Sequence, residues 1–154
     1  MKSHLSELFV GDQKSVRVGQ IIYRINGEQV EILLVRSFTP GYDNGFDFPK
    51  GGKHKNETDE EGSAREVLEE TGLRTKIVAD LGSEEYFKTK LHLFLAKYES
   101  GGLDFEGNAI GGDYENDIKR FFNFELALKM INPKRKNFLL KAKKEIKRIE
   151  GIEE

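Results

Sequence analysis

Three glutamates stand close together in the sequence: Glu66, Glu69 and Glu70. They fall in a segment that predicts a helix from about Asp59 to Thr71. Residues three or four positions apart are neighbours on a helix, so the three carboxylates should project from one side. Like charges at this spacing destabilise a helix by about 0.2–0.5 kcal/mol per pair. Carboxylate oxygens suit Mg²⁺ or Mn²⁺, which keep positions open for water and phosphate. The pattern therefore indicates either a divalent-cation site or a solvated acidic face.

Both ends of this helix carry clear signals. Thr58 and Glu61 have the spacing of a capping box, in which each side chain bonds to the other residue's backbone N–H. Gly72 suits the left-handed position that ends many helices. The side facing away from the acids offers residues for a core: Ala64, Val67, Leu68 and Thr71.

The segment before the helix combines small residues with cations. Gly51 and Gly52 allow the backbone to approach a ligand closely, and Lys50 and Lys53 supply positive charge for phosphate. A cationic loop that leads into a metal-binding helix predicts a site for a phosphorylated substrate.

The spacing resembles the signature of the Nudix hydrolase family: Gly51, five residues, Glu57, seven residues, then Arg65 to Leu73 (REVLEETGL). The resemblance implies hydrolysis of a pyrophosphate bond on an α+β fold, an α/β/α sandwich with a mixed β-sheet between helices. It also implies that Glu66, Glu69 and Glu70 bind the divalent cation. Arg65, four residues before Glu69, could hold that carboxylate in place, and Glu57 could orient Arg65 or a water. Which glutamate acts as the base stays open.

Many members of this family carry a further carboxylate on a loop after the sheet, as metal ligand or base. Asp113, Glu115 and Asp117 are the candidates here. Glu115 lies six residues before an aromatic pair, as in the resembled segment, and is our choice. The alternative is a solvated loop acid without a role.

Two features resemble the dinucleoside polyphosphate hydrolases within the family. The run FDFPKG at residues 46–51 resembles their W-x-F-P-K-G entry, with Phe46 in place of tryptophan, and Tyr86 resembles a tyrosine that packs near the base. The implied reaction cleaves diadenosine tetraphosphate to ATP and AMP. Alternatives are a nucleoside triphosphate pyrophosphohydrolase, an inositol polyphosphate phosphohydrolase and a non-catalytic nucleotide-binding module. Further candidates for substrate contacts are Arg36, Tyr42, Lys88 and Lys90.

The flanking segments predict strands and two further helices. Strands are expected at 15–25, 30–35, 76–81, 85–88, 91–98 and 118–122, with helices at 125–130 and from Asn132 onward. Asn26 and Gly27 predict a hairpin turn, and 37–45 and 105–117 read as loops. The last helix has an apolar stripe formed by Phe138, Ala142, Ile146 and Ile149.

Length and composition fit one domain over residues 1–154, with 37% hydrophobic and 34% charged residues. There is no cysteine, which excludes disulfides and thiolate metal sites. A net charge of −2 argues against bulk binding of DNA. Eight Lys or Arg residues between Lys134 and Arg148 form either a solvated face or help to attract polyphosphate, and RNA is an unlikely partner. The start of the chain lacks a signal-peptide pattern, so we expect a cytoplasmic protein without a membrane partner.

Overall fold

The computed structural model describes residues 15–37, 45–113 and 116–152. Strands and helices alternate along these segments. The elements in chain order are β1 (Ser15–Asn26), β2 (Gln29–Ser37), β3 (Phe46–Asp47), β4 (Lys50–Gly52), α2 (Asp59–Thr71), β5 (Arg74–Tyr86), β6 (Thr89–Ser100), β7 (Asn116–Asn123), α3 (Phe124–Met130), the 3₁₀ turn η1 (Pro133–Arg135) and α4 (Lys136–Glu150).

The strands form one mixed sheet around β1. The main order is β3-β2-β1-β6-β5, while β4 pairs with β1 and β7 pairs with β2. β1 runs parallel to β6, and the other described pairs are antiparallel. Because β1 pairs with β2 through its second half and with β4 through Arg17–Gly19, the short strand that carries Lys50 lies beside the start of β1.

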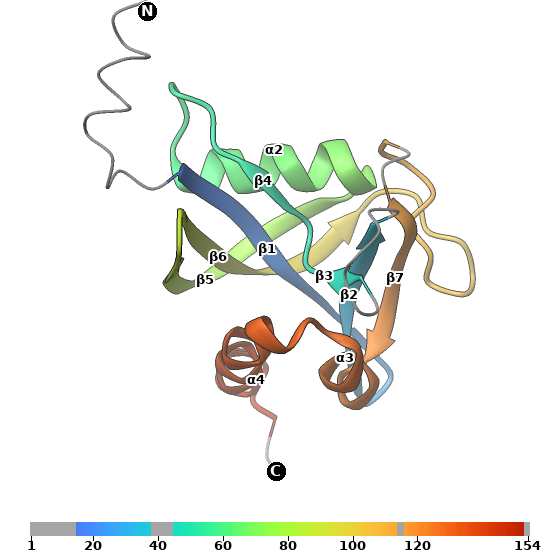
Figure 1. The fold of residues 1–154 in the computed structure, drawn as a ribbon. Helices are drawn as coiled ribbons and strands as arrows, with labels where there is room; N and C mark the ends of the chain where they lie inside the picture. The colour runs from blue at the N-terminus through green and yellow to red at the C-terminus, as the bar shows by residue number, and fades with distance from the viewer. Residues whose placement is uncertain (1–14, 38–44, 114–115, 153–154) are drawn as a thin grey trace, which may run out of the picture.

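Helices cover the sheet on both sides, with α2 on one face and α3 and α4 on the other (Figure 1). Two apolar clusters fill the spaces between the layers. One joins Ile22, Leu33 and Phe121 of the sheet to Val67 of α2. The larger one joins the opposite sheet face to α3 and α4. The predicted α+β sandwich with a mixed sheet is confirmed.

The local signals at the ends of α2 act as the sequence predicts. The Thr58 side chain accepts from the Glu61 N–H at 3.0 Å, and the Glu61 carboxylate accepts from the Thr58 N–H at 2.8 Å. Gly72 ends the helix with φ of 72°. The predicted faces of α2 need a correction, because Glu70 is buried and Leu68 is 40% exposed. The buried side of α2 therefore includes one of the three acids.

Several predicted strands change their limits. The expected strands at 76–81 and 85–88 form one continuous β5, whose pairing with β6 shifts register between Asp80 and Ser83, so Gly82 lies inside the strand. The segment at 46–52, read as a loop, contains β3 and β4. Their backbone pairing with β2 and β1, which no local pattern reveals, makes these short segments strands.

The end of the chain returns to the sheet. Asn132 accepts from the Lys134 N–H at 3.1 Å and starts η1, which leads into α4. The predicted apolar stripe of α4 is confirmed, since Phe138, Ala142 and Ile146 are buried in the larger core cluster. Within the ranges described, no helix combines the length and the apolarity needed to span a membrane.

The packing of α4 gives a test of the larger core. Phe138 is fully buried, whereas Leu140 on the same helix is 47% exposed. Phe138→Ala should lower the free energy of unfolding by about 3–5 kcal/mol because it leaves a cavity. Leu140→Ala should lower it by less than about 1 kcal/mol. Urea denaturation of both variants measures this, and equal losses would contradict the described packing.

Candidate active site

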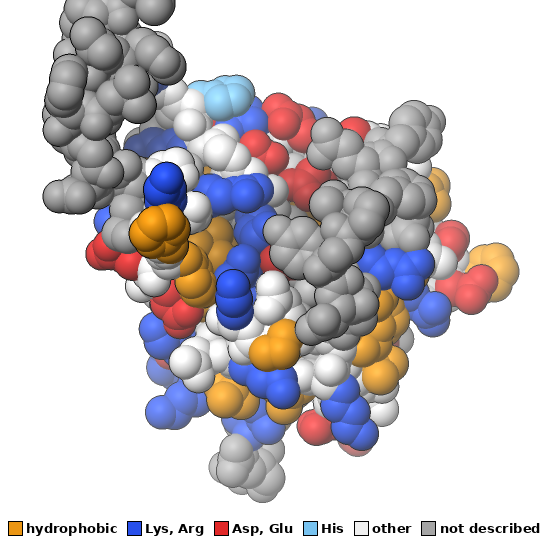
Figure 2. All heavy atoms as spheres, viewed as in Figure 1, with side chains coloured by type: hydrophobic (Ala, Val, Ile, Leu, Met, Phe, Trp, Pro, Cys, Tyr) orange, Lys and Arg blue, Asp and Glu red, His pale blue; other side chains and the backbone are white. Residues whose placement is uncertain are grey.

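A cavity of about 670 Å³ lies where the end of α2 meets β3, β4, the β5–β6 hairpin and η1. Its walls differ in charge. Acidic side chains of α2 line one part: Glu66, Glu69 and Glu70. Cations from other elements line the rest: Arg17, Lys50, Lys134 and Arg135. Figure 2 shows Lys and Arg side chains gathered on this face next to a group of Asp and Glu side chains over α2.

Arg65 joins the acidic side chains to the loop before α2. Its Nη1 donates to Glu66 Oε1 at 3.1 Å and to Glu69 Oε1 at 3.2 Å. Its Nη2 donates to the Gly52 carbonyl at 3.0 Å and to Glu57 Oε1 at 2.7 Å. These bonds raise the pKa of Arg65 above its usual value, with the bond to Glu57 the main cause. One guanidinium therefore pairs with three carboxylates and offsets part of their negative charge.

Glu57 supports Arg65 from the loop side. Its carboxylate accepts from Arg65 Nε at 2.9 Å and from the backbone N–H of His54 at 2.7 Å. The hydrogen bond from Arg65, followed by that from His54, lowers the pKa of Glu57 to about 2. Glu57 thus stays ionised and holds Arg65 in place through these hydrogen bonds.

Glu70 differs from the other two glutamates. Its side chain is buried, and its Oε1 accepts from Asn116 Nδ2 at 3.3 Å. Its Oε2 is buried without a hydrogen-bond partner in the described part of the chain. Burial, followed by the negative charge of Glu66, raises the pKa of Glu70 to about 8. A buried carboxylate oxygen without a donor is costly, and a cation would relieve that cost.

Gly51 leaves room for the Glu66 carboxylate because it has no side chain. A Cβ atom on Gly51 would clash with the Glu66 carboxyl group, whereas a Cβ on Gly52 would meet nothing within 4 Å. The glycine pair predicted to allow a close approach therefore divides into two roles. Gly51 makes space for the carboxylate, and Gly52 offers its carbonyl to Arg65.

Lys50 is one of the cations that line the cavity. Its Nζ lies 3.4 Å from Asp47 Oδ2, and burial lowers its pKa. Asp47 Oδ1 also accepts from Arg135 Nε at 3.1 Å. Tyr86 lines the cavity as well, and its ring lies under the Arg135 guanidinium at 5.2 Å. Lys50 and Tyr86, both predicted from the sequence, therefore belong to the same cavity as the glutamates.

The other predicted cations have different positions. Lys53 pairs with Asp59 Oδ1 at 2.9 Å, and Asp59 also bonds to His92. Lys88 lies over the Phe87 ring at 5.4 Å, and Arg36 over the Phe46 ring at 5.7 Å. These three cations are absent from the described lining of the cavity.

The remaining predicted contacts divide between the cavity wall and the undescribed segments. Phe46 lines the cavity and also belongs to the core. Tyr42 and Glu115 lie outside the described residues. Of the other two loop acids, Asp113 lines the cavity, and Asp117 is part of β7.

Sequence reasoning missed several polar residues that line the cavity, among them Arg17, Asp47, Asn116 and Arg135. Arg17 had a local signal, because it stands between Val16 and Val18 in a strand and should point away from the core. Arg135 had none, since its approach to the cavity depends on how the C-terminal segment packs on β3, where Asn132 N donates to the Phe46 carbonyl at 3.1 Å.

The NUDIX domain profile matches residues 14–142 of this chain. The chain belongs to the NUDIX domain family. Members of this family generally use divalent metal cations. The match includes the cavity, α2 and the segment that carries Arg135.

Two curated Arabidopsis thaliana proteins are similar over part of their length. "Nudix hydrolase 16, mitochondrial" is 39% identical over 67 residues, which is 44% of this chain and 35% of the relative. "Nudix hydrolase 4" is 34% identical over 80 residues, 49% of this chain and 38% of the relative. The matched region thus spans little more than a third of these relatives.

Solved structures share the fold over most of the chain. A NUDIX hydrolase from Nitrosomonas europaea is 28% identical with a TM-score of 0.63, covering 84% of this chain and 69% of its own. A C. elegans Ap4A hydrolase is 20% identical with a TM-score of 0.69, covering 86% of this chain and 97% of its own. At 20% identity, the likeness to the C. elegans protein shows a shared fold and nothing more.

The residues of the Nudix signature fit a divalent cation by their chemistry. Carboxylate oxygens are preferred ligands of Mg²⁺ and Mn²⁺, and Glu70 Oε2 is buried without a donor. Within residues 15–37, 45–113 and 116–152, no three acidic or histidine side chains converge closely enough to hold a metal. Arg65 now contacts Glu66 and Glu69, so their carboxylates would have to turn toward a bound cation.

The raised pKa of Glu70 predicts a pH-dependent stability of the metal-free protein. The folded carboxyl keeps its proton up to about pH 8, while the unfolded one releases it near 4.5. The protonated carboxyl therefore stabilises the folded state fully below pH 4.5, and this stabilisation is lost as the pH rises through 8. With a chelator present, the free energy of unfolding of wild type should fall between pH 4.5 and 8 by on the order of a few kcal/mol relative to that of Glu70→Gln.

Denaturation curves at several pH values measure this difference. Glu60→Gln, an exposed position on the same helix, is the matched control and should track wild type at every pH. Parallel profiles for wild type and Glu70→Gln would show that Glu70 titrates normally.

The two glycines before α2 give a matched pair of variants. Gly51→Ala should displace the Glu66 carboxylate and weaken Mn²⁺ binding about 10-fold or more. Gly52→Ala has open space and should bind Mn²⁺ like wild type. Calorimetric titration of Mn²⁺ compares them, and equal affinities would disprove the role given to Gly51.

Proposed function

We propose that this chain hydrolyses a pyrophosphate bond in a nucleoside-diphosphate-linked substrate, with Mg²⁺ as the divalent cation. The main support for the proposal is that acidic and basic side chains line the same cavity. Glu66, Glu69 and Glu70 line the cavity, and so does a group of cations that includes Lys50. A polyphosphate bound with a metal ion needs both kinds of wall, because the cation requires anionic ligands and the remaining phosphate charge requires cations.

The chemistry is an attack of water on phosphorus. The water oxygen forms a new P–O bond, the bridging P–O bond breaks, and a carboxylate takes the proton of the water. A bound divalent cation would polarise the phosphate oxygens and lower the pKa of a water. Arg65 holds Glu66 and Glu69 in place, and Lys50 stabilises negative charge on the departing phosphate. The loop carboxylate is proposed to be Glu115, with Asp113 the alternative at the cavity.

Dinucleoside polyphosphates are our first choice of substrate, with diadenosine tetraphosphate cleaved to ATP and AMP. Two observations support this choice. The FDFPKG segment supplies Asp47 and Lys50 to the cavity, and Tyr86 places an aromatic ring at its wall. Stacking of a base on an aromatic ring contributes about 1–3 kcal/mol. The fold shared with the C. elegans Ap4A hydrolase is consistent with the proposal.

A second candidate is an inositol polyphosphate, which carries dense negative charge and no base. The group of cations in the cavity favours it, as does the Arg135 guanidinium over the Tyr86 ring, which covers one face that a base would use. A nucleoside triphosphate would use the same residues. The three substrates therefore belong in one assay.

The proposal predicts that hydrolysis depends on Glu69. A panel of dinucleoside polyphosphates, nucleoside triphosphates, sugar nucleotides and inositol phosphates would be incubated with Mg²⁺ and the products identified by mass. Glu69→Gln should lower kcat by about 100-fold or more on the preferred substrate, because one acid of the site loses its charge. The loss of fold should be small, since the side chain is 53% exposed.

Glu60→Gln is the control, since it removes an equal charge from an exposed position of α2. It should retain wild-type kcat. Full activity of Glu69→Gln would remove that residue from the reaction. No hydrolysis of any member of the panel by wild type would reject the proposed function.

A further inference from the structure

Arg135 reaches the cavity from the C-terminal segment, far in sequence from the Nudix signature. η1 is fixed to the sheet because Asn132 N donates to the Phe46 carbonyl at 3.1 Å. Arg135 is the last residue of η1, and it lines the same cavity as the three glutamates. Its side chain is only 11% exposed, which is unusual for an arginine on an otherwise solvated basic segment.

The Arg135 side chain is held by two residues of the cavity wall. Its Nε donates to Asp47 Oδ1 at 3.1 Å, and its guanidinium lies over the Tyr86 ring at 5.2 Å. Asp47 is itself fixed, because its Oδ1 accepts from the Phe48 N–H at 2.8 Å. The guanidinium plane is therefore set before any ligand arrives, which reduces the entropy lost on binding.

One nitrogen of this guanidinium is left unpaired in the described part of the chain. Arg135 Nη1 is buried and has no hydrogen-bond partner there. An arginine fork with an unused donor suits an oxyanion such as phosphate, which accepts two parallel N–H bonds.

Asp47 places Arg135 beside Lys50 on the wall of the cavity. Its carboxylate lies 3.4 Å from Lys50 Nζ and 3.1 Å from Arg135 Nε. Both cations line the cavity together with the three glutamates. A phosphate at this point of the wall would therefore meet two positive charges.

We propose that Arg135 binds a phosphate of the substrate together with Lys50, and that Asp47 is the positioning residue that holds the guanidinium at this place. A phosphate chain that contacts both cations can form charged hydrogen bonds with each of them. This inference rests on the proposed function for its kinetics, but phosphate binding tests it separately.

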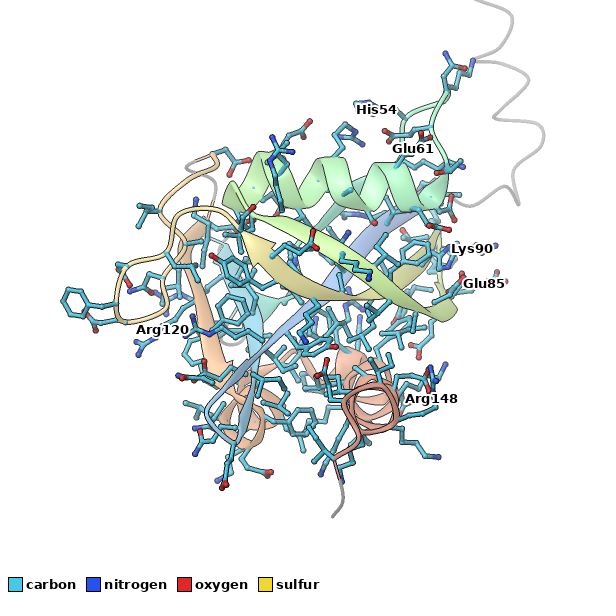
Figure 3. The ribbon with its side chains drawn as sticks, turned by 180° about the vertical axis from the view of Figure 1, so that it is seen from behind. His54, Glu61, Glu85, Lys90, Arg120 and Arg148 are labelled. Atoms are coloured by element: carbon cyan, nitrogen blue, oxygen red, sulfur yellow. The ribbon has the colours of Figure 1, made fainter. Side chains whose placement is uncertain are left out.

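The test measures phosphate binding on the full chain without metal. Calorimetry would measure inorganic tripolyphosphate with wild type, Arg135→Gln and Arg148→Gln. Arg135→Gln should weaken tripolyphosphate binding about 10-fold or more, because the charged hydrogen bond from the guanidinium is lost. Arg148, 64% exposed on the outside of α4 (Figure 3), is the matched control, and Arg148→Gln should leave the affinity unchanged.

Two further variants keep the proposal open to refutation if Arg135→Gln folds poorly. Arg135→Lys retains charge without the fork and should bind tripolyphosphate with an affinity between those of wild type and Arg135→Gln. Asp47→Asn should raise KM for diadenosine tetraphosphate several-fold, with kcat changed less than about twofold, because it misaligns a binding group only. Unfolding curves of each variant check the fold.

Unchanged tripolyphosphate affinity in Arg135→Gln, or an equal loss in Arg148→Gln, would overturn the role of Arg135. If wild type hydrolyses nothing in the panel but Arg135→Gln still loses tripolyphosphate affinity, the proposed function fails and this inference stands. If wild type hydrolyses diadenosine tetraphosphate and Arg135→Gln keeps its tripolyphosphate affinity, this inference fails and the proposed function stands.

Discussion

Arg65 donates hydrogen bonds to three carboxylates and one carbonyl, and these bonds decide where the acidic side chains of α2 can lie. Without a cation among them, Glu66, Glu69 and Glu57 would repel one another across one turn of helix and the adjoining loop. The guanidinium offsets this repulsion and also fixes the loop to the helix. Glu70 lies beyond its reach in a buried position, where the charge of its carboxylate is not offset in the same way.

The fold brings opposite charges to one cavity from separate layers. α2 contributes the acids from one face of the sheet, while β1 and β4 contribute Arg17 and Lys50 from within it. The C-terminal segment contributes Arg135 from the opposite layer. Asp47 connects the last two, since its carboxylate contacts both Lys50 and Arg135. The cavity therefore depends on the packing of all three layers as well as on the signature segment.

Local signals were sufficient to predict α2 and its two ends. Thr58, Glu61 and Gly72 set both ends of the helix, because capping acts within a few residues. The contact between Arg65 and Glu69 follows from helical spacing alone. The approach of Gly51 to Glu66 was expected only as a loop that could come close to a ligand, since the pairing of β4 with β1 involves residues about 30 positions apart.

Long-range packing decided what the sequence could not show. Glu70 was expected on the same face as Glu66 and Glu69, yet it is buried beside Asn116, a residue of β7. Lys53 was expected at the phosphate site, but Asp59 holds it at the start of α2. Asp47 and Arg135 lie 88 positions apart in sequence, so no local pattern could pair them. These contacts arise only when the sheet and the C-terminal helix pack together.

The most direct test of the central claim is a crystal structure with Mn²⁺ and a nonhydrolysable dinucleoside polyphosphate. Anomalous scattering would locate the metal. The account predicts Mn²⁺ at about 2.1–2.2 Å from carboxylate oxygens of the Glu66, Glu69 and Glu70 group, with the phosphate chain between it and Lys50. Density for the nucleotide elsewhere, with those carboxylates still bound only to Arg65 and Asn116, would contradict it.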